Sequence, residues 1–212
     1  MQQIETLTFG SYYHIYNRGI DSCNLFKEPD NFEYFLSLYD KYISPVAETF
    51  AWVLMQNHFH FLVRINEESE ILVALAIPYR VPNPVRDKES DHLKIGSPSQ
   101  QFSKLFNSYA QAFNKRTERH GNLFERPFKR KAIDNEWYLK QVIIYIHNNP
   151  VHHGFCTHPV EYPWSSYLTC ISLKPTKLNR ERVIGWFDDQ ANFIYMHNQK
   201  VELDQIEDWL EL

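Results

Sequence analysis

Segments with strand-like and helix-like patterns predict an α+β protein built on an antiparallel sheet. Runs rich in aromatic and β-branched residues are typical of strands, and apolar residues spaced three and four apart are typical of amphipathic helices. Along the chain these patterns follow the order strand, helix, strand, strand, helix, strand, helix. That order predicts a ferredoxin-like (RRM-like) antiparallel sheet with helices packed on it, plus one added helix and a C-terminal extension.

The first half of the chain supplies a strand, a helix and a hairpin. Residues 8–17 are aromatic and β-branched, which predicts the first strand. Pro29 suits the first turn of a helix whose apolar residues then recur on one face. Two apolar runs, residues 49–55 and 59–65, flank a short polar break, so we expect a β-hairpin there.

The second half supplies the remaining elements. Residues 77–99 contain four prolines and several charges, which predict a connecting loop. Residues 100–118 have the spacing of an amphipathic helix, and residues 128–133 should form a short strand. Asp134 is the expected N-cap of a last helix, which Pro150 should end.

The chain divides into a main domain, residues 1–150, and a C-terminal extension, residues 151–212. The extension is rich in aromatic residues and is therefore too apolar to be disordered. We expect it to pack on the main domain. Its aromatic residues are Phe155, Tyr162, Trp164, Tyr167, Trp186, Phe187, Phe193, Tyr195 and Trp209.

Composition is that of an ordinary globular protein, with 43% hydrophobic and 23% charged residues. No apolar run approaches the roughly eighteen residues of a membrane span, and the N-terminus lacks the character of a secretory signal. The three cysteines are odd in number and lack CxxC spacing, which argues against a disulfide framework or a zinc knuckle. We therefore expect a soluble, cytoplasmic protein with no membrane partner.

Charge is distributed unevenly along the chain, although the net charge is only -4. Seven basic residues and two acidic ones lie between Lys115 and Lys131. Seven acidic residues and one basic residue lie between Asp188 and Leu212. This asymmetry is typical of a middle segment that binds a polyanion, although two ordinary solvated surfaces would give the same pattern.

The first candidate for chemistry is a histidine pair on the second strand of the hairpin. Period two puts His58 and His60 on one face, with Cβ atoms about 6.6 Å apart. Two imidazoles at that spacing can close around one ion. The alternative is that His58 lies in the turn and His60 fills a polar hole in the sheet.

The second candidate is a tyrosine and an asparagine on the last predicted helix. Tyr145 and Asn149 are four residues apart, so they project from one helical face about 6 Å apart. If that face covers the histidines, His58, His60 and Asn149 can hold one divalent ion beside the Tyr145 hydroxyl. Such ligands suit Mg²⁺ or Mn²⁺ with open positions better than a closed structural zinc site. The alternative is that Tyr145 is a core aromatic residue.

Together these segments resemble a known family. Residues 51–63, AWVLMQNHFHFLV, resemble the HUH (His-hydrophobic-His) strand of single-tyrosine transposases, and residues 145–151, YIHNNPV, resemble their catalytic-tyrosine helix. The ending NPV is most similar to the REP-associated tyrosine transposases, bacterial relatives of insertion-sequence transposases. Residues 16–19, 121–126 and 162–167 are also similar, and the likeness covers about residues 8–170. The insertion-sequence branch usually has glutamine at the position of Asn149.

The resemblance implies metal-dependent nicking and joining of single-stranded DNA by a catalytic domain over residues 1–150. Tyr145 would be the nucleophile that forms a 5′-phosphotyrosine link, with Mg²⁺ or Mn²⁺ on His58, His60 and Asn149. The substrate would be a single strand beside a hairpin, because the family is associated with imperfect palindromes. Composite sites across dimers in relatives make a homodimer one expected arrangement. The candidates for phosphate contacts are Arg18, Arg126, Lys129, Arg130 and Lys131.

Three other functions stay open at this point. A nucleic-acid-binding module of the RNA-recognition type would need neither metal nor nucleophile, although the chain lacks the aromatic pattern of such modules. A metal-dependent phosphodiesterase would use water and leave no protein on the DNA. A domesticated or inactive relative of the transposases would bind DNA without cutting it.

Overall fold

The computed structural model describes residues 5–71, 97–199, 206 and 209. Most of the loop predicted over residues 77–99 lies outside the described residues. Its last residues are described, and they begin a helix.

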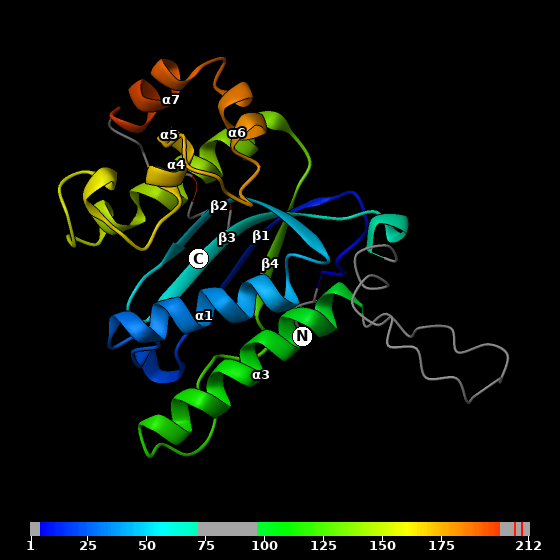
Figure 1. The fold of residues 1–212 in the computed structure, drawn as a ribbon, viewed down its shortest axis with the longest axis vertical. Helices are drawn as coiled ribbons and strands as arrows, with labels where there is room; N and C mark the ends of the chain where they lie inside the picture. The colour runs from blue at the N-terminus through cyan, green and yellow to red at the C-terminus, as the bar shows by residue number, and fades with distance from the viewer. Residues whose placement is uncertain (1–4, 72–96, 200–205, 207–208, 210–212) are drawn as a thin grey trace, which may run out of the picture.

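The sheet has four strands, β1 (Tyr12–Arg18), β2 (Ala47–Leu54), β3 (His58–Ile65) and β4 (Lys129–Ile133). Their order across the sheet is β2-β3-β1-β4, and all neighbours are antiparallel. With helices between β1 and β2 and between β3 and β4, the connectivity is that of a ferredoxin-like split unit (Figure 1). The predicted α+β fold class is therefore confirmed.

One face of the sheet is covered by α1 (Pro29–Tyr42) and α3 (Pro98–Arg116), which lie together in Figure 1. Both helices begin with proline in the first turn, as the pattern at Pro29 predicts. Their apolar faces meet the odd-numbered residues of β3, so that Phe35 packs on Phe59 with ring centroids 5.2 Å apart. This core fixes which face of β3 remains for the histidines.

The opposite face is covered by α4 (Glu136–His152) and by the C-terminal helices α5 (Tyr167–Ile171), α6 (Arg180–Trp186) and α7 (Gln190–His197) (Figure 1). A second core joins these helices to the sheet. It includes Leu62, Val142, Ile146, Tyr167 and Phe193. The described part of the extension therefore shares a core with α4, while the domain boundary at residue 150 stays a prediction.

Two expectations about α4 were wrong. Asn135, not Asp134, caps the helix, because its Oδ1 accepts a hydrogen bond from the backbone N–H of Tyr138. Pro150 does not end the helix, which continues to His152 with the proline inside it. A proline in the last turn removes one backbone hydrogen bond without preventing the turn from closing.

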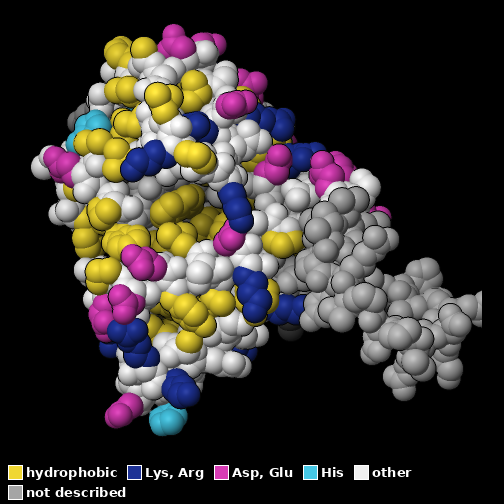
Figure 2. All heavy atoms as spheres, viewed as in Figure 1, with side chains coloured by type: hydrophobic (Ala, Val, Ile, Leu, Met, Phe, Trp, Pro, Cys, Tyr) yellow, Lys and Arg dark blue, Asp and Glu magenta, His cyan; other side chains and the backbone are white. Residues whose placement is uncertain are grey.

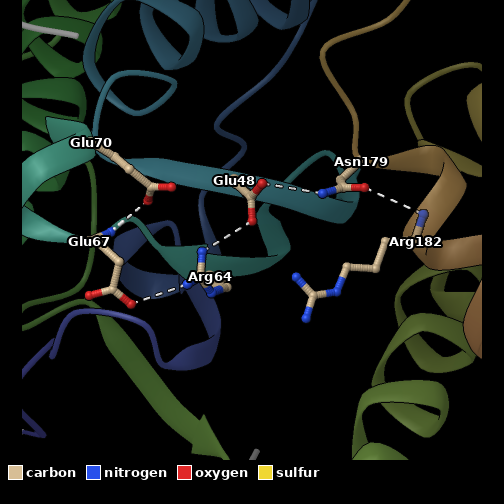
Figure 3. Close-up of polar contacts among 6 residues, drawn as sticks. All are labelled: Glu48, Arg64, Glu67, Glu70, Asn179 and Arg182. Carbon is tan, nitrogen blue, oxygen red and sulfur yellow. Dashed lines mark hydrogen bonds and ion pairs between the residues drawn. The ribbon is translucent and has the colours of Figure 1, made fainter. Parts of the chain in front are cut away.

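Polar contacts tie the extension to the end of the sheet far from His58 (Figure 3). Asn179 donates to Glu48 at 3.3 Å, and Glu48 forms an ion pair with Arg64 at 3.4 Å. Arg182 of α6 lies over aromatic rings of the sheet and of its own helix, those of Tyr12, Phe50 and Trp186. The extension is therefore held at this end of the sheet by a hydrogen bond to Glu48 and by the packing of Arg182 over aromatic rings.

A hollow with apolar walls lies between α1 and the C-terminal helices, beside β2 (Figure 2). It has a volume of about 720 Å³, and its lining includes Tyr39, Trp52 and Leu178. An ion pair of 2.6 Å between Lys177 and Asp40 joins the extension to α1 nearby. The extension thus contacts α1 as well as the sheet.

Within the described part of the chain, no helix has the length and apolar character needed to cross a membrane. The three cysteines, Cys23, Cys156 and Cys170, are free thiols, so the expectation that they form no disulfide framework agrees with the structure.

Candidate active site

Strand alternation places three histidines on the sheet face that α4 covers. His58 and His60 of β3 lie two residues apart and project to the same side. In the β1–β3 register, Tyr16 lies opposite His60, and His14 lies opposite Leu62. His14 and Tyr16 therefore join the two predicted histidines on one face.

Helix α4 places Tyr145 and Asn149 over these histidines. The ring centroid of Tyr145 is 5.3 Å from that of His60, with the two rings at 87°. Oδ1 of Asn149 is 3.0 Å from Nε2 of His58. The four residues singled out in the sequence therefore lie together, although their chemical roles stay a prediction.

The atoms around His58 suit a divalent cation. A neutral imidazole has one N–H and one lone pair, and Nδ1 of His58 is 2.7 Å from Oδ1 of Asn57. Where Nδ1 donates to Asn57, the Nε2 lone pair faces Oδ1 of Asn149 at 3.0 Å, whereas in the other tautomer Nε2 donates to that oxygen. Neighbouring ligands of an octahedral ion with bonds of about 2.1 Å are separated by about 3.0 Å. The two atoms therefore have the spacing of adjacent ligands.

The site offers few protein ligands. Among the residues that the structure describes, no three His, Cys, Asp or Glu side chains are grouped to hold a metal. A cation held by two imidazoles and the Asn149 amide would keep positions for oxygen atoms of water or phosphate, as Mg²⁺ usually does. The residues present therefore fit an open catalytic site better than a closed structural one.

Burial keeps the site histidines neutral. It lowers the pKa of His58 to about 4 and that of His14 to about 3. It also holds the pKa of His60 well below its usual value, to which the neighbouring His14 and His58 add. Neutral imidazoles have the lone pairs that metal binding requires.

His14 was missed by the sequence interpretation. Its Nε2 is 2.9 Å from Nδ1 of His60, its ring lies 6.2 Å from that of Tyr145, and its side chain is fully buried. Period two in the first strand shows which side His14 takes, but the pairing of β1 with β3 is not visible in the sequence.

His153 was missed as well. It follows the end of α4 as an exposed C-cap residue, and its ring centroid is 5.1 Å from that of His58. The sequence did contain a signal for His153. Positions 145, 149 and 153 are four residues apart and so lie along one helical face.

The candidates for phosphate contacts on β4 are divided between the two faces of the sheet. Register pairs Lys129 with Tyr16 and Lys131 with His14, so both lysines project from the histidine face. Arg130 pairs with Ile15 and projects from the opposite face, where its guanidinium lies 3.8 Å over the Phe128 ring. The three basic residues cannot act as one contiguous patch, because successive strand residues point to opposite sides.

The remaining basic candidates are also divided. Arg18 lies opposite His58 in the sheet and is paired with Glu125 at 3.8 Å. Arg126 is exposed and donates to Asn107 of α3. With Arg130 it lines a cavity of about 660 Å³ between α3 and the segment before β4. Arg18 is therefore beside the candidate site, whereas Arg126 is with Arg130.

Comparisons with known proteins establish the fold alone. No protein-family profile matches the chain, and no curated protein sequence matches it. The chain has the fold class of a ferredoxin-like α+β protein, and a solved structure shares that fold. That structure is a REP-associated tyrosine transposase bound to a REP hairpin, and its sequence is 15% identical to this one. The two structures superpose with a TM-score of 0.56 over 82% of this chain and 88% of the transposase chain.

Proposed function

We propose that this protein nicks single-stranded DNA and transfers the strand through a 5′-phosphotyrosine intermediate, as a transposase-like enzyme. The observation that carries the proposal is the convergence of His58, His60, Asn149 and Tyr145 on one face. A structural neighbour of the same fold is a tyrosine transposase, which supports a DNA-processing role.

In the proposed reaction the Tyr145 hydroxyl oxygen attacks a backbone phosphorus. The new bond joins that oxygen to phosphorus, and the bond to O3′ breaks to give a free 3′-hydroxyl. Attack of another 3′-hydroxyl on the phosphotyrosine reverses the step and joins strands. No high-energy cofactor is required, since the covalent link conserves the phosphodiester energy.

His58, His60 and Asn149 are the residues that would hold a divalent metal, Mg²⁺ or Mn²⁺. When bound, such an ion supplies Lewis-acid stabilisation of the charge that develops on the phosphate. Lys129, Lys131 and Arg18 on the same face would contact neighbouring phosphates. We place this activity in the cytoplasm, where free thiols are stable.

The proposed substrate is a single strand beside a hairpin. The structural neighbour was solved with a REP hairpin. Only 3% of Tyr145 is exposed, so substrate binding has to open a path to its hydroxyl.

The burial of Tyr145 favours a second candidate function, a nucleic-acid-binding protein that forms no covalent link. The same lysines and Arg18 would bind phosphates, and Tyr145 would be a core residue. A water-using phosphodiesterase is a third candidate, because the proposed cation could also act on a bound water.

One experiment separates these candidates. The protein is incubated with labelled single-stranded hairpin DNA and Mn²⁺, and denaturing gels are examined for a protein–DNA adduct. Tyr138→Phe is the matched control, because Tyr138 lies on α4 but stacks on Trp209 at 4.0 Å, away from the histidines. An adduct that is lost only in Tyr145→Phe supports strand transfer. Cleavage without an adduct indicates a phosphodiesterase, and binding without cleavage indicates a binding protein.

A further inference from the structure

His14 has the position of a residue that controls one candidate metal ligand. It lies on β1, next to β3, and its Nε2 contacts Nδ1 of His60 at 2.9 Å. The two rings are parallel within 5°, with centroids 5.0 Å apart. Both side chains are buried, so water cannot replace this contact readily.

The contact couples the protons of the two rings. In the neutral form of both rings, which is the form that can bind a cation, a hydrogen bond between Nε2 of His14 and Nδ1 of His60 contains one proton, which belongs to one ring. If Nδ1 of His60 donates, its Nε2 has a lone pair that can bind a cation. If Nε2 of His14 donates, the proton of His60 lies on its own Nε2 and blocks that atom.

We propose that His14 is a positioning residue for the metal site, whose Nε2 accepts the Nδ1 proton of His60 and so presents the Nε2 lone pair of His60 to the cation. The inference rests on the proposed function for the presence of a cation. Metal-binding histidines usually donate their second N–H to a nearby acceptor, and such acceptors contribute about 10- to 100-fold to metal affinity. Here the acceptor is an imidazole.

The surroundings of His14 agree with a role in the site rather than in the sheet. Its ring is also perpendicular to that of Tyr145, at 89° and 6.2 Å, so it contacts the candidate ligand and lies near the candidate nucleophile. Nδ1 of His14 is a buried atom with no hydrogen-bond partner among the described residues, so within that part of the chain the polar contact of this ring is the one with His60.

Mn²⁺ binding by the DNA-free protein tests the inference without using activity. His14→Phe preserves a ring but removes the acceptor, and we expect Mn²⁺ affinity to fall by about 10- to 100-fold. His14→Gln retains an acceptor oxygen and should recover part of the affinity. Tyr12→Phe is the matched control on the same strand and face, because its hydroxyl has no hydrogen-bond partner among the described residues. Equal affinity in His14→Phe and the parent overturns the inference.

Nitrogen NMR of the Mg²⁺-saturated protein provides a second readout that does not depend on how stable a variant is. His60 should be protonated at Nδ1 and His14 should have a bare Nε2, with His60→Gln used to assign the signals. A proton on Nε2 of His60 overturns the inference, as does a parent protein that binds no cation.

The two proposals fail differently. If the parent forms the adduct but His14→Phe binds Mn²⁺ with the affinity of the parent, the proposal of strand transfer is supported and the proposed role of His14 is wrong. If the parent binds Mn²⁺ through the predicted tautomer but forms no adduct, the proposed role of His14 is supported and the proposal of strand transfer is wrong.

Discussion

At the scale of single residues, the candidate site combines neutral histidines with a buried tyrosine. Burial lowers the pKa values of His14, His58 and His60, so these rings stay uncharged near neutral pH. The packing that shields the histidines from solvent also covers Tyr145. The candidate ligands and the candidate nucleophile therefore depend on the same burial but differ in chemistry, so their substitutions should have different effects.

Tyr145→Phe should abolish the covalent DNA adduct and leave Mn²⁺ affinity close to that of the parent, because it removes only the hydroxyl. His60→Ala should lower Mn²⁺ affinity by more than about tenfold and reduce cleavage with it, with partial recovery at high Mn²⁺. Calorimetric titration and denaturing gels measure the two properties separately. An adduct formed by Tyr145→Phe would assign the nucleophile to another tyrosine.

Phosphate contacts should follow the face of the sheet. Replacing Lys129 and Lys131 together with alanine should weaken binding of single-stranded DNA of any sequence. It should also reduce the slope of log affinity against log salt by about 1.4, since each phosphate contact contributes about 0.7. Arg130→Ala is the comparison, because Arg130 projects from the opposite face. A larger change of slope in Arg130→Ala than in the lysine pair would place the DNA on the α3 side.

At the scale of elements, α4 is fixed to the rest of the molecule by a buried polar chain. Nδ1 of His147 contacts His197 of α7 at 2.9 Å, and its Nε2 contacts Ser166 at 2.8 Å. Ser166 also accepts from the backbone N–H of Trp52 in β2. The chain thus joins the tyrosine helix to the extension and to the sheet, and it gives residues 162–167, noted in the sequence, a structural role.

His147→Leu should destabilise the protein by about 1–3 kcal/mol, because it leaves the buried Nε2 of His197 without a partner and removes one hydrogen bond of Ser166. The shift of α4 should also slow adduct formation. Tyr195→Ala, on an exposed position of α7, should change stability by less than about 0.5 kcal/mol. Urea unfolding gives both values. An unchanged unfolding midpoint in His147→Leu would show that packing alone holds α4.

At the scale of the whole molecule, four buried histidines and the half-buried His58 make stability depend on pH. The pKa values of His14, His58 and His197 are lowered to about 3, 4 and 4, and those of His60 and His147 are well below the usual value. The unfolded chain binds protons below about pH 6.5, whereas the folded protein does not until lower pH. The contribution of the neutral histidines to the free energy of unfolding is therefore fully present above about pH 6.5. It is lost as the pH falls toward about 4.

We expect the free energy of unfolding to fall by several kcal/mol between pH 7 and pH 5, at up to about 1.4 kcal/mol per pH unit for each buried histidine. His197→Phe should reduce the slope of the free energy of unfolding against pH by the contribution of one histidine, up to about 1.4 kcal/mol per pH unit. Urea unfolding at a series of pH values measures it. A constant free energy of unfolding over this range would mean that the histidines are solvated in the folded protein.

Several features of the fold and site follow from the sequence. The element order gave the ferredoxin-like class, because strand and helix periods are properties of the local backbone. The same periods put His58 with His60 and Tyr145 with Asn149. They also place Lys129 and Lys131 on the face of the sheet opposite to Arg130. The end of α4 was misjudged, because the effect of Pro150 depends on its place in the last turn.

Other features were decided only by the tertiary structure. The face of the sheet that α4 covers, and so the meeting of Tyr145 and Asn149 with the histidines, depends on how two distant amphipathic surfaces pack. The pairing of β1 with β3 brings His14 to His60, residues separated by 46 positions. Such contacts depend on strand register and on cores shared across the whole chain, and no local period encodes them.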